Sequence, residues 1–234
     1  MISPAVGPDF SVLLPTSDAK RLLHRLNTLE TKKPPEFSSS ISEMQLNALP
    51  EQWQKIARAQ SIKTADENEK AATDWLISLF NILFAHQQVI LVRGDSEPEY
   101  FPAKNNEPAR IEFAHGFFQS ALHELSHFCI AGERRRQLAD FGYWYAPDGR
   151  SAAQQKAFER VEIKPQALEC LFSLACGRPF QVSEDNLFAD FDTSDSTFAD
   201  DVYQQAEKYI TYPHTLPRDA KTLLQSLLHI CIAD

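Results

Sequence analysis

The sequence predicts an α+β fold in which one predominantly helical domain carries a small β-sheet. Apolar residues recur at helical spacing over several long segments. Only two short runs show the β-branched or alternating pattern that is typical of strands. The chain has 234 residues, and 43% of them are hydrophobic, which suffices for one core of ordinary size. We therefore expect a single folded domain with an appended segment.

Residues 1–70 are expected to form an N-terminal extension that is partly disordered. Prolines and a run of three serines at 38–40 interrupt this segment, and its apolar content is low. Two short helices are expected within it, at residues 20–29 and 44–59. Because little of the extension resembles core, residues 71–234 are expected to form the functional domain.

The domain is expected to open with a helix and two short strands. Helical spacing of apolar residues predicts a helix over residues 71–83, and a β-branched run predicts a strand over 89–92. Three prolines between positions 98 and 108 predict a loop. Residues 110–114 alternate as a second strand would, and a helix is expected to follow over about 117–132.

The remainder of the chain is expected to be mainly helical. Residues 155–176 follow a helical pattern that contains Pro165. Because proline is tolerated best in the first turn of a helix, we expect a new helix to begin at Pro165. Two closing amphipathic helices are predicted over residues 203–210 and 220–232.

Charge and cysteine content point to a cytoplasmic protein. Acidic residues outnumber basic ones by 32 to 23, and the net charge of -9 argues against a general affinity for nucleic acid. The four cysteines include no C-x-x-C pair, so free thiols are expected rather than disulfides. We see no secretory signal and no apolar run long enough for a membrane span, so no membrane partner is expected.

One short segment carries a pattern with chemical meaning, His123-Glu124-Leu125-Ser126-His127. Positions four apart lie on the same face of a helix, so both imidazoles can reach one divalent ion. In metallopeptidases with this H-E-x-x-H pattern, the enclosed carboxylate acts as general base on a metal-bound water. The sequence therefore predicts a metallopeptidase-like metal helix.

Further ligands and a pocket wall are expected downstream of this motif. Glu162 and Glu169 are both set among apolar neighbours, and either carboxylate would complete a metal site with the two histidines. The stretch over residues 139–150 is rich in aromatic side chains and is bounded by turn residues. Such a loop is expected to wall a pocket with large rings.

Several motifs in the same order resemble the bacterial elongation factor P hydroxylase family. These are H-E-L-S-H at 123–127, D-F-G-Y-W-Y at 140–145 with P-D-G-R at 147–150, and V-E-I-K-P-Q-A-L at 161–168. The resemblance extends from about Trp75 to the closing helices and leaves residues 1–70 outside. It implies an oxidoreductase of the monooxygenase type that hydroxylates the modified lysine of elongation factor P after translation.

The resemblance also implies a centre of two histidines and one carboxylate, with positions open for oxygen chemistry. His123 and His127 would be metal ligands, and Glu162 is preferred as the third ligand, with Glu169 as the alternative. The implied metal is Fe(II), although another divalent metal would suit the same donors, and O2 is the expected cosubstrate. No anchoring pattern for two-oxoglutarate is found in the sequence.

The chemistry that the resemblance implies makes further residues candidates for catalysis and substrate binding. Glu124 is the catalytic candidate, because its carboxylate can move a proton or hold a metal-bound water. His115, Asp140, Tyr143 and Asp148 are the candidate substrate-binding residues, and the two aspartates would contact the ammonium group of the lysine.

Two other functions are compatible with the motif. A zinc metallopeptidase would use Glu124 as general base and would bind an extended peptide along an exposed edge strand. A binding module without activity would dock its acidic face on a translation factor and would hold the metal in a closed four-ligand site. The identity of the bound metal and the measured activity distinguish the hydroxylase, the peptidase and the binding module.

Overall fold

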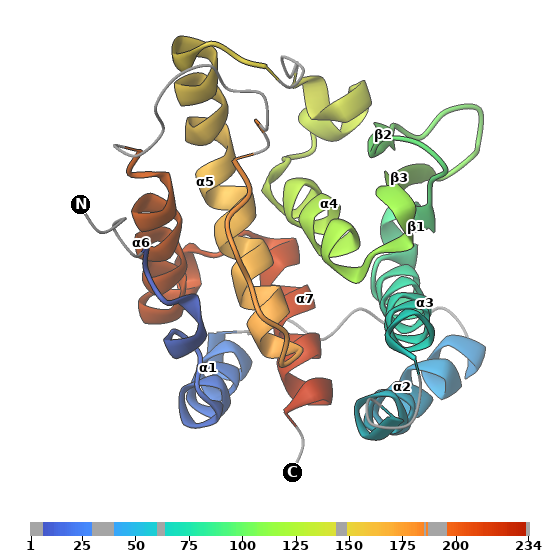
Figure 1. The fold of residues 1–234 in the computed structure, drawn as a ribbon. Coiled ribbons are helices and arrows are strands. Elements are labelled where there is room, and N and C mark those ends of the chain that lie inside the picture. Colours follow the sequence, from blue (N-terminus) through green and yellow to red (C-terminus); the bar gives the residue numbers. More distant parts are fainter. Residues whose placement is uncertain are drawn as a thin grey trace.

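The computed structural model describes residues 7–29, 40–59, 64–143, 149–184, 186 and 196–232. These residues form seven α-helices and one three-stranded sheet, which confirms the predicted helical α+β class (Figure 1). Over these same ranges, no helix has both the length and the apolar content that a membrane crossing requires.

Helix α5 (Ala152–Ala175) lies between α4 (Phe118–Ile130) and α6 (Phe198–Thr211) in Figure 1. Helix α7 (Arg218–Cys231) packs against both α4 and α5. On the other side of α4, helix α3 (Ala65–Leu83) packs against α4 and the first strand. The buried side chains of these helices join in one hydrophobic core, so the central pair α4 and α5 is held from both sides.

The sheet lies beside α4 and contains strands β1 (Val89–Arg93), β2 (Glu99–Phe101) and β3 (Ala109–Phe113). Central β3 pairs in parallel with β1 and antiparallel with β2, where Tyr100 lies opposite Ile111. The prediction of a loop throughout the segment between the two expected strands is therefore wrong. Strand β2 has only three residues, which is too short to show the alternation that identifies a strand.

The predicted motif helix is present as α4, and a tight turn, η3 (Ala114–Gly116), leads into it from β3. His115 and Gly116 adopt positive φ angles of 55° and 74°, which reverse the chain direction. Glu69 of α3 accepts a hydrogen bond of 2.7 Å from the backbone N–H of Phe118. This bond satisfies one of the N–H groups that the start of a helix leaves without a partner.

Helix α5 runs without interruption from Ala152 to Ala175, so the prediction that a new helix begins at Pro165 is wrong. Proline inside a helix removes the donor for the carbonyl four residues earlier, in this case that of Val161. Pro165 is buried, and α5 packs against both α4 and α6. This tertiary packing outweighs the unfavourable helix propensity of one residue.

Helices α1 (Thr16–Leu29) and α2 (Ser40–Ala59) lie where the sequence predicts helices in the N-terminal segment. Contrary to the expectation that this segment adds little to the core, Leu22 and Leu49 are each only 1% exposed. Trp75 of α3 also donates a hydrogen bond of 3.0 Å to the backbone carbonyl of Leu49. A few large apolar side chains at helical spacing therefore suffice to dock both helices, despite the low average apolar content.

Short 3-10 turns connect the main elements, and they lie at η1 (Phe10–Val12), η2 (Ala85–Gln87), η3 (Ala114–Gly116), η4 (Arg135–Gln137), η5 (Ala139–Gly142) and η6 (Pro213–Thr215). Two of them, η4 and η5, follow α4 and pack against each other, and η5 also packs against β2.

Candidate metal centre

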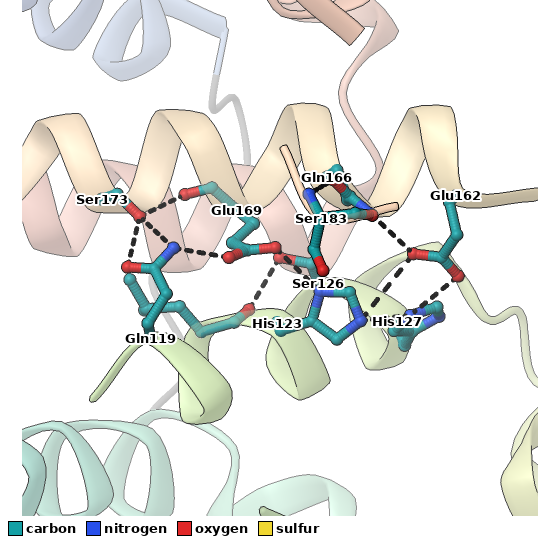
Figure 2. Close-up of polar contacts among 10 residues, drawn as sticks. Gln119, His123, Ser126, His127, Glu162, Gln166, Glu169, Ser173 and Ser183 are labelled. Carbon is teal, nitrogen blue, oxygen red and sulfur yellow. Dashed lines mark hydrogen bonds and ion pairs between the residues drawn. The ribbon is translucent and has the colours of Figure 1, made fainter. Parts of the chain in front are cut away.

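Helices α4 and α5 lie side by side and direct their polar residues toward each other (Figure 2). His123 and His127 lie one turn apart on the face of α4 that meets α5, because positions four apart share a helix face. Their Nε2 atoms are 3.1 Å apart. Since two ring nitrogens in such contact cannot both carry a proton, at least one presents a lone pair to the space between the helices.

Glu162 of α5 completes the group. Its Oε1 lies 3.3 Å from Nε2 of His127, and its Oε2 lies 3.8 Å from Nε2 of His123. The glutamate is only 1% exposed. One donor atom from each of the three side chains lies within 4.8 Å of the other two.

The three donor atoms suit a divalent ion in both spacing and chemistry. Two donors that each lie about 2.1 Å from one ion, at about 90–110° to each other, are about 3.0–3.4 Å apart. The two Nε2 atoms are 3.1 Å apart and Nε2 of His127 lies 3.3 Å from Oε1 of Glu162, both within that range, whereas Nε2 of His123 lies 3.8 Å from the other carboxylate oxygen, Oε2. Two imidazole nitrogens and one carboxylate oxygen are a donor set that both zinc and non-haem iron accept.

Glu169 lies on the other side of the His123 ring. Its Oε2 is 2.8 Å from Nδ1 of His123, whereas the Nε2 atom of that ring faces His127 and Glu162. Seven residues of helix separate the two glutamates by about 10.5 Å along the axis of α5. Of the two glutamates considered as third ligand, the structure therefore brings Glu162, and not Glu169, to the paired Nε2 atoms.

Burial and nearby charges shift the pKa values of His123 and Glu162 in opposite directions. Burial lowers the pKa of His123, but the charge and hydrogen bond of Glu169, together with the charge of Glu162, raise it to about 10. Burial raises the pKa of Glu162, but the charge and hydrogen bond of His127 outweigh it and bring the pKa to about 2. Glu162 is therefore ionised at neutral pH, as a metal ligand must be.

A cavity of about 460 Å³ opens beside the three donor atoms. Besides Glu162, four more carboxylate residues line it, Glu97, Glu124, Asp140 and Glu169, and none of the described residues that line it is a lysine or an arginine. Burial raises the pKa of the Glu124 carboxyl, although the two histidines lower it in part. A cavity with this excess of carboxylates favours a cationic side chain.

Aromatic side chains form another part of the cavity wall. Tyr100 of β2 and Phe141 of η5 stack with ring centroids 4.0 Å apart, and Phe158 of α5 also lines the cavity. Such rings can pack against the methylene groups of a long side chain and exclude water from the donor atoms. Of the described part of the 139–150 stretch, Asp140 and Phe141 line the cavity, so this stretch contributes one of the three rings, and β2 and α5 contribute the other two.

The predicted substrate-binding residues lie in different places. Asp140 lines the cavity, and its Oδ1 accepts a hydrogen bond of 2.9 Å from the backbone N–H of Tyr100. The Tyr143 ring lies 6.5 Å from the His127 ring, under the guanidinium group of Arg135. His115 is exposed at the turn before α4 and is not among the described residues that line the cavity.

Asp148, the fourth predicted substrate-binding residue, lies outside the described residues. Other residues of the site were missed in the sequence although their spacing signals them. Gln119 lies four positions before His123, Gln166 lies four after Glu162, and Ser173 lies four after Glu169. All three share the facing sides of α4 and α5 with those residues (Figure 2).

Gln166 links the site to the segment that follows α5. Its side chain donates to the backbone carbonyl of Ser183 at 2.8 Å and accepts from the backbone N–H of Ser183 at 2.9 Å. It also lies 3.5 Å from Oε2 of Glu162. The segment around Ser183 is thereby fixed over α5 at the edge of the cavity.

Comparisons with known proteins agree with this site. The family described as "Elongation factor P hydroxylase" matches residues 79–232, a range that contains all three donor residues. The "Elongation factor P lysine hydroxylase" of Haemophilus influenzae is 45% identical over 156 residues, which cover 65% of this chain and 85% of that protein. The extent of both matches shows that the chain belongs to the elongation factor P hydroxylase family.

Proposed function

We propose that this protein is a non-haem iron enzyme that hydroxylates the modified lysine of elongation factor P in the cytoplasm, with O2 as cosubstrate. The observation that carries the proposal is the convergence of His123, His127 and Glu162 in a member of this family. The related protein in Haemophilus influenzae is named as a lysine hydroxylase of elongation factor P.

The donor set supports iron because two histidines and one carboxylate leave coordination positions for other molecules. Bound iron would supply the oxidising chemistry that a lysine carbon requires, since protein side chains alone do not provide it. The task of the chain is then to hold the lysine beside these donors and to keep bulk water away. The rings of Tyr100, Phe141 and Phe158 suit that task.

The carboxylates of the cavity account for the choice of a lysine. Glu97, Glu124 and Asp140 would attract the cationic side chain, and ionic strength would weaken this attraction. Glu124 follows His123 directly in the sequence and lines the cavity beside the donor atoms. Its carboxylate is therefore positioned to accept or return a proton during the reaction.

The test is a mass measurement of elongation factor P after incubation with the iron-loaded protein and a reductant under air. We expect the wild-type protein to add the mass of one oxygen atom to the modified lysine. His123→Ala should bind no iron and should leave the mass unchanged, because it lacks one of two imidazole ligands. An unchanged mass with the iron-loaded wild-type protein, under several reductants, would count against the proposal.

A zinc metallopeptidase remains the second candidate, because Glu124 lies beside the histidines as a general base must. The edge strand β2 also borders the cavity through Tyr100. Metal analysis of the purified protein and incubation with an unstructured peptide distinguish the two functions. Bound zinc together with cleavage that Glu124→Gln abolishes would favour the peptidase.

A further inference from the structure

We propose that Glu169 is a positioning residue that fixes the orientation and tautomer of His123, with Gln119 and Ser173 as its supports. The inference rests on the proposed metal centre and assigns a role to a carboxylate that does not belong to the donor group. It follows from the contacts of one ring nitrogen and from the way in which its partner is held.

The first step concerns the two nitrogens of the His123 ring. Nδ1 lies 2.8 Å from Oε2 of Glu169, and an ionised carboxylate can only accept a hydrogen bond. Nδ1 therefore carries the proton in this contact, and once His123 is neutral, as a metal ligand must be, its lone pair lies on Nε2. That atom is the one that faces His127 and Glu162. Histidine ligands commonly donate a hydrogen bond to a carboxylate from the ring nitrogen that does not bind the metal.

The second step concerns Glu169, which is itself held in one orientation. The side-chain amide of Gln119 donates hydrogen bonds to Oε1 of Glu169 and, at 3.1 Å, to Oγ of Ser173. The Ser173 hydroxyl donates to the backbone carbonyl of Glu169 at 2.8 Å. Glu169 is only 6% exposed, so little water competes for its oxygens. Figure 2 shows this chain of contacts running along the α4–α5 interface toward the donor atoms.

The third step concerns the order of residues along the two helices. Gln119 and Ser173 lie at one end of the interface, the His123–Glu169 pair lies next, and His127 with Glu162 lies at the other end (Figure 2). The contacts therefore come from one face of each helix. Gln119 bonds to Glu169 and Ser173 rather than to His123, so a change at Gln119 should have a smaller effect than a change at Glu169.

The test is titration of metal-free protein with Co(II), followed by the visible absorption of the bound ion, which reports affinity and ligand geometry. We expect Glu169→Ala to weaken Co(II) binding by about 10–100-fold and to alter the absorption spectrum. Glu169→Gln should restore part of the affinity, because its amide oxygen can still accept from Nδ1. Gln119→Ala should cause a loss of only a few fold.

Glu159→Gln is the matched control, because Glu159 is another hydrogen-bonded glutamate of α5, partly buried, but it bonds to Gln155 and Ser196 rather than to a histidine. It should bind Co(II) like the wild-type protein, and circular dichroism should show that every variant is folded. Equal Co(II) affinity and spectra for Glu169→Ala and Glu159→Gln would overturn the inference.

The outcome is separable from that of the proposed function. A wild-type protein that binds no Co(II) or Fe(II) would overturn both proposals. If the wild-type protein binds the metal but leaves elongation factor P unmodified, the proposed function fails, while the expected loss in Glu169→Ala would still support the positioning role.

Discussion

The donor atoms of the candidate metal centre lie on two packed helices, whereas another part of the same cavity is built from a short strand and a 3-10 turn. His123, His127 and Glu162 are fixed by helical spacing and by the contact between α4 and α5. Asp140 and Phe141, by contrast, lie in a turn where both adopt positive φ angles, of 47° and 56°. Rigid helices suit metal coordination, which tolerates little displacement, whereas loops and turns commonly carry residues that bind a substrate.

The largest effect should follow from replacing Glu162, one of the candidate metal ligands on the two helices. Glu162→Gln preserves the shape of the side chain but replaces an ionised ligand with a neutral amide. We expect Fe(II) affinity to fall by more than about 100-fold, beyond the 10–100-fold typical of residues that only support a ligand. Hydroxylation of elongation factor P should fall with it. Measurement of bound iron and of the mass of elongation factor P checks both expectations.

Glu159→Gln on the same helix is the control for the loss of one negative charge, and it should retain iron and activity. Retention of full iron affinity by Glu162→Gln, with Glu169→Ala losing it, would reverse the roles of the two glutamates.

The next prediction tests whether Glu124 takes part in the hydroxylation step without binding the metal. Glu124 lines the cavity but is not one of the three donors, so Glu124→Gln should retain iron within a few fold. If its carboxylate moves a proton, the rate of hydroxylation should fall by about 100-fold. Single-turnover rates with saturating elongation factor P measure this step. An unchanged rate would limit Glu124 to substrate attraction, which higher ionic strength should weaken.

The sequence predicted the part of the cavity on helices α4 and α5 better than the part on strand β2 and turn η5. The spacing of His123 and His127 is a local property of one helix and could be read directly. The choice between Glu162 and Glu169 depends on how α5 packs against α4, which no local pattern contains. Strand β2 escaped prediction for a related reason, because an edge strand of three residues is stabilised by its partner β3 rather than by its own pattern.

The prediction for Pro165 failed because local propensity was given more weight than packing. The residues that hold the donors, such as Gln119 and Gln166, were missed although they lie one helical turn from a donor or its support. Glutamine at helical spacing is common on exposed faces, so its role becomes visible only when the facing helix is known. The division of the chain at residue 70 stays a prediction.

A third prediction concerns Arg136, which connects strand β2 of the cavity wall to helix α4. Arg136 accepts a hydrogen bond from the Tyr100 hydroxyl through its carbonyl and donates to the Phe128 carbonyl of α4. Its guanidinium also pairs with Asp219, which is 4% exposed, at 2.6 Å. Asp219→Asn should lower the free energy of unfolding by about 3 kcal/mol, because it removes one partner of a buried ion pair. Thermal unfolding at neutral pH measures this loss.

The same variant has a predictable pH dependence. Burial raises the pKa of Asp219, but hydrogen bonds from Arg218 and Arg136 outweigh burial and lower it below the usual 3.8. The stabilisation is therefore present above pH 3.8 and is lost as pH falls through the lower folded-state pKa. The difference between wild type and Asp219→Asn should accordingly shrink in strong acid. Asp18→Asn, which breaks an exposed pair with Arg21, should cost less than about 1 kcal/mol.

The smallest effect should arise at Glu69, which lies outside the residues that the family matches and supports the start of α4. Glu69 precedes the matched range of 79–232, yet it accepts from the Phe118 N–H at 2.7 Å and from Arg178 at 2.6 Å. Glu69→Ala should destabilise the protein by about 1 kcal/mol, as loss of a helix cap does. That change corresponds to a fall in melting temperature of about 2–4 °C for a chain of this length.

Iron affinity of the folded Glu69→Ala protein should be unchanged, because the donors are held by contacts between α4 and α5 that Glu69 does not make. Glu69→Gln should lie between wild type and Glu69→Ala, since its amide oxygen can still accept from Phe118. If Glu69→Ala instead lost iron affinity as strongly as Glu169→Ala, the start of α4 would control the position of His123. The metal centre would then depend on the N-terminal segment as well as on the two helices that carry its donors.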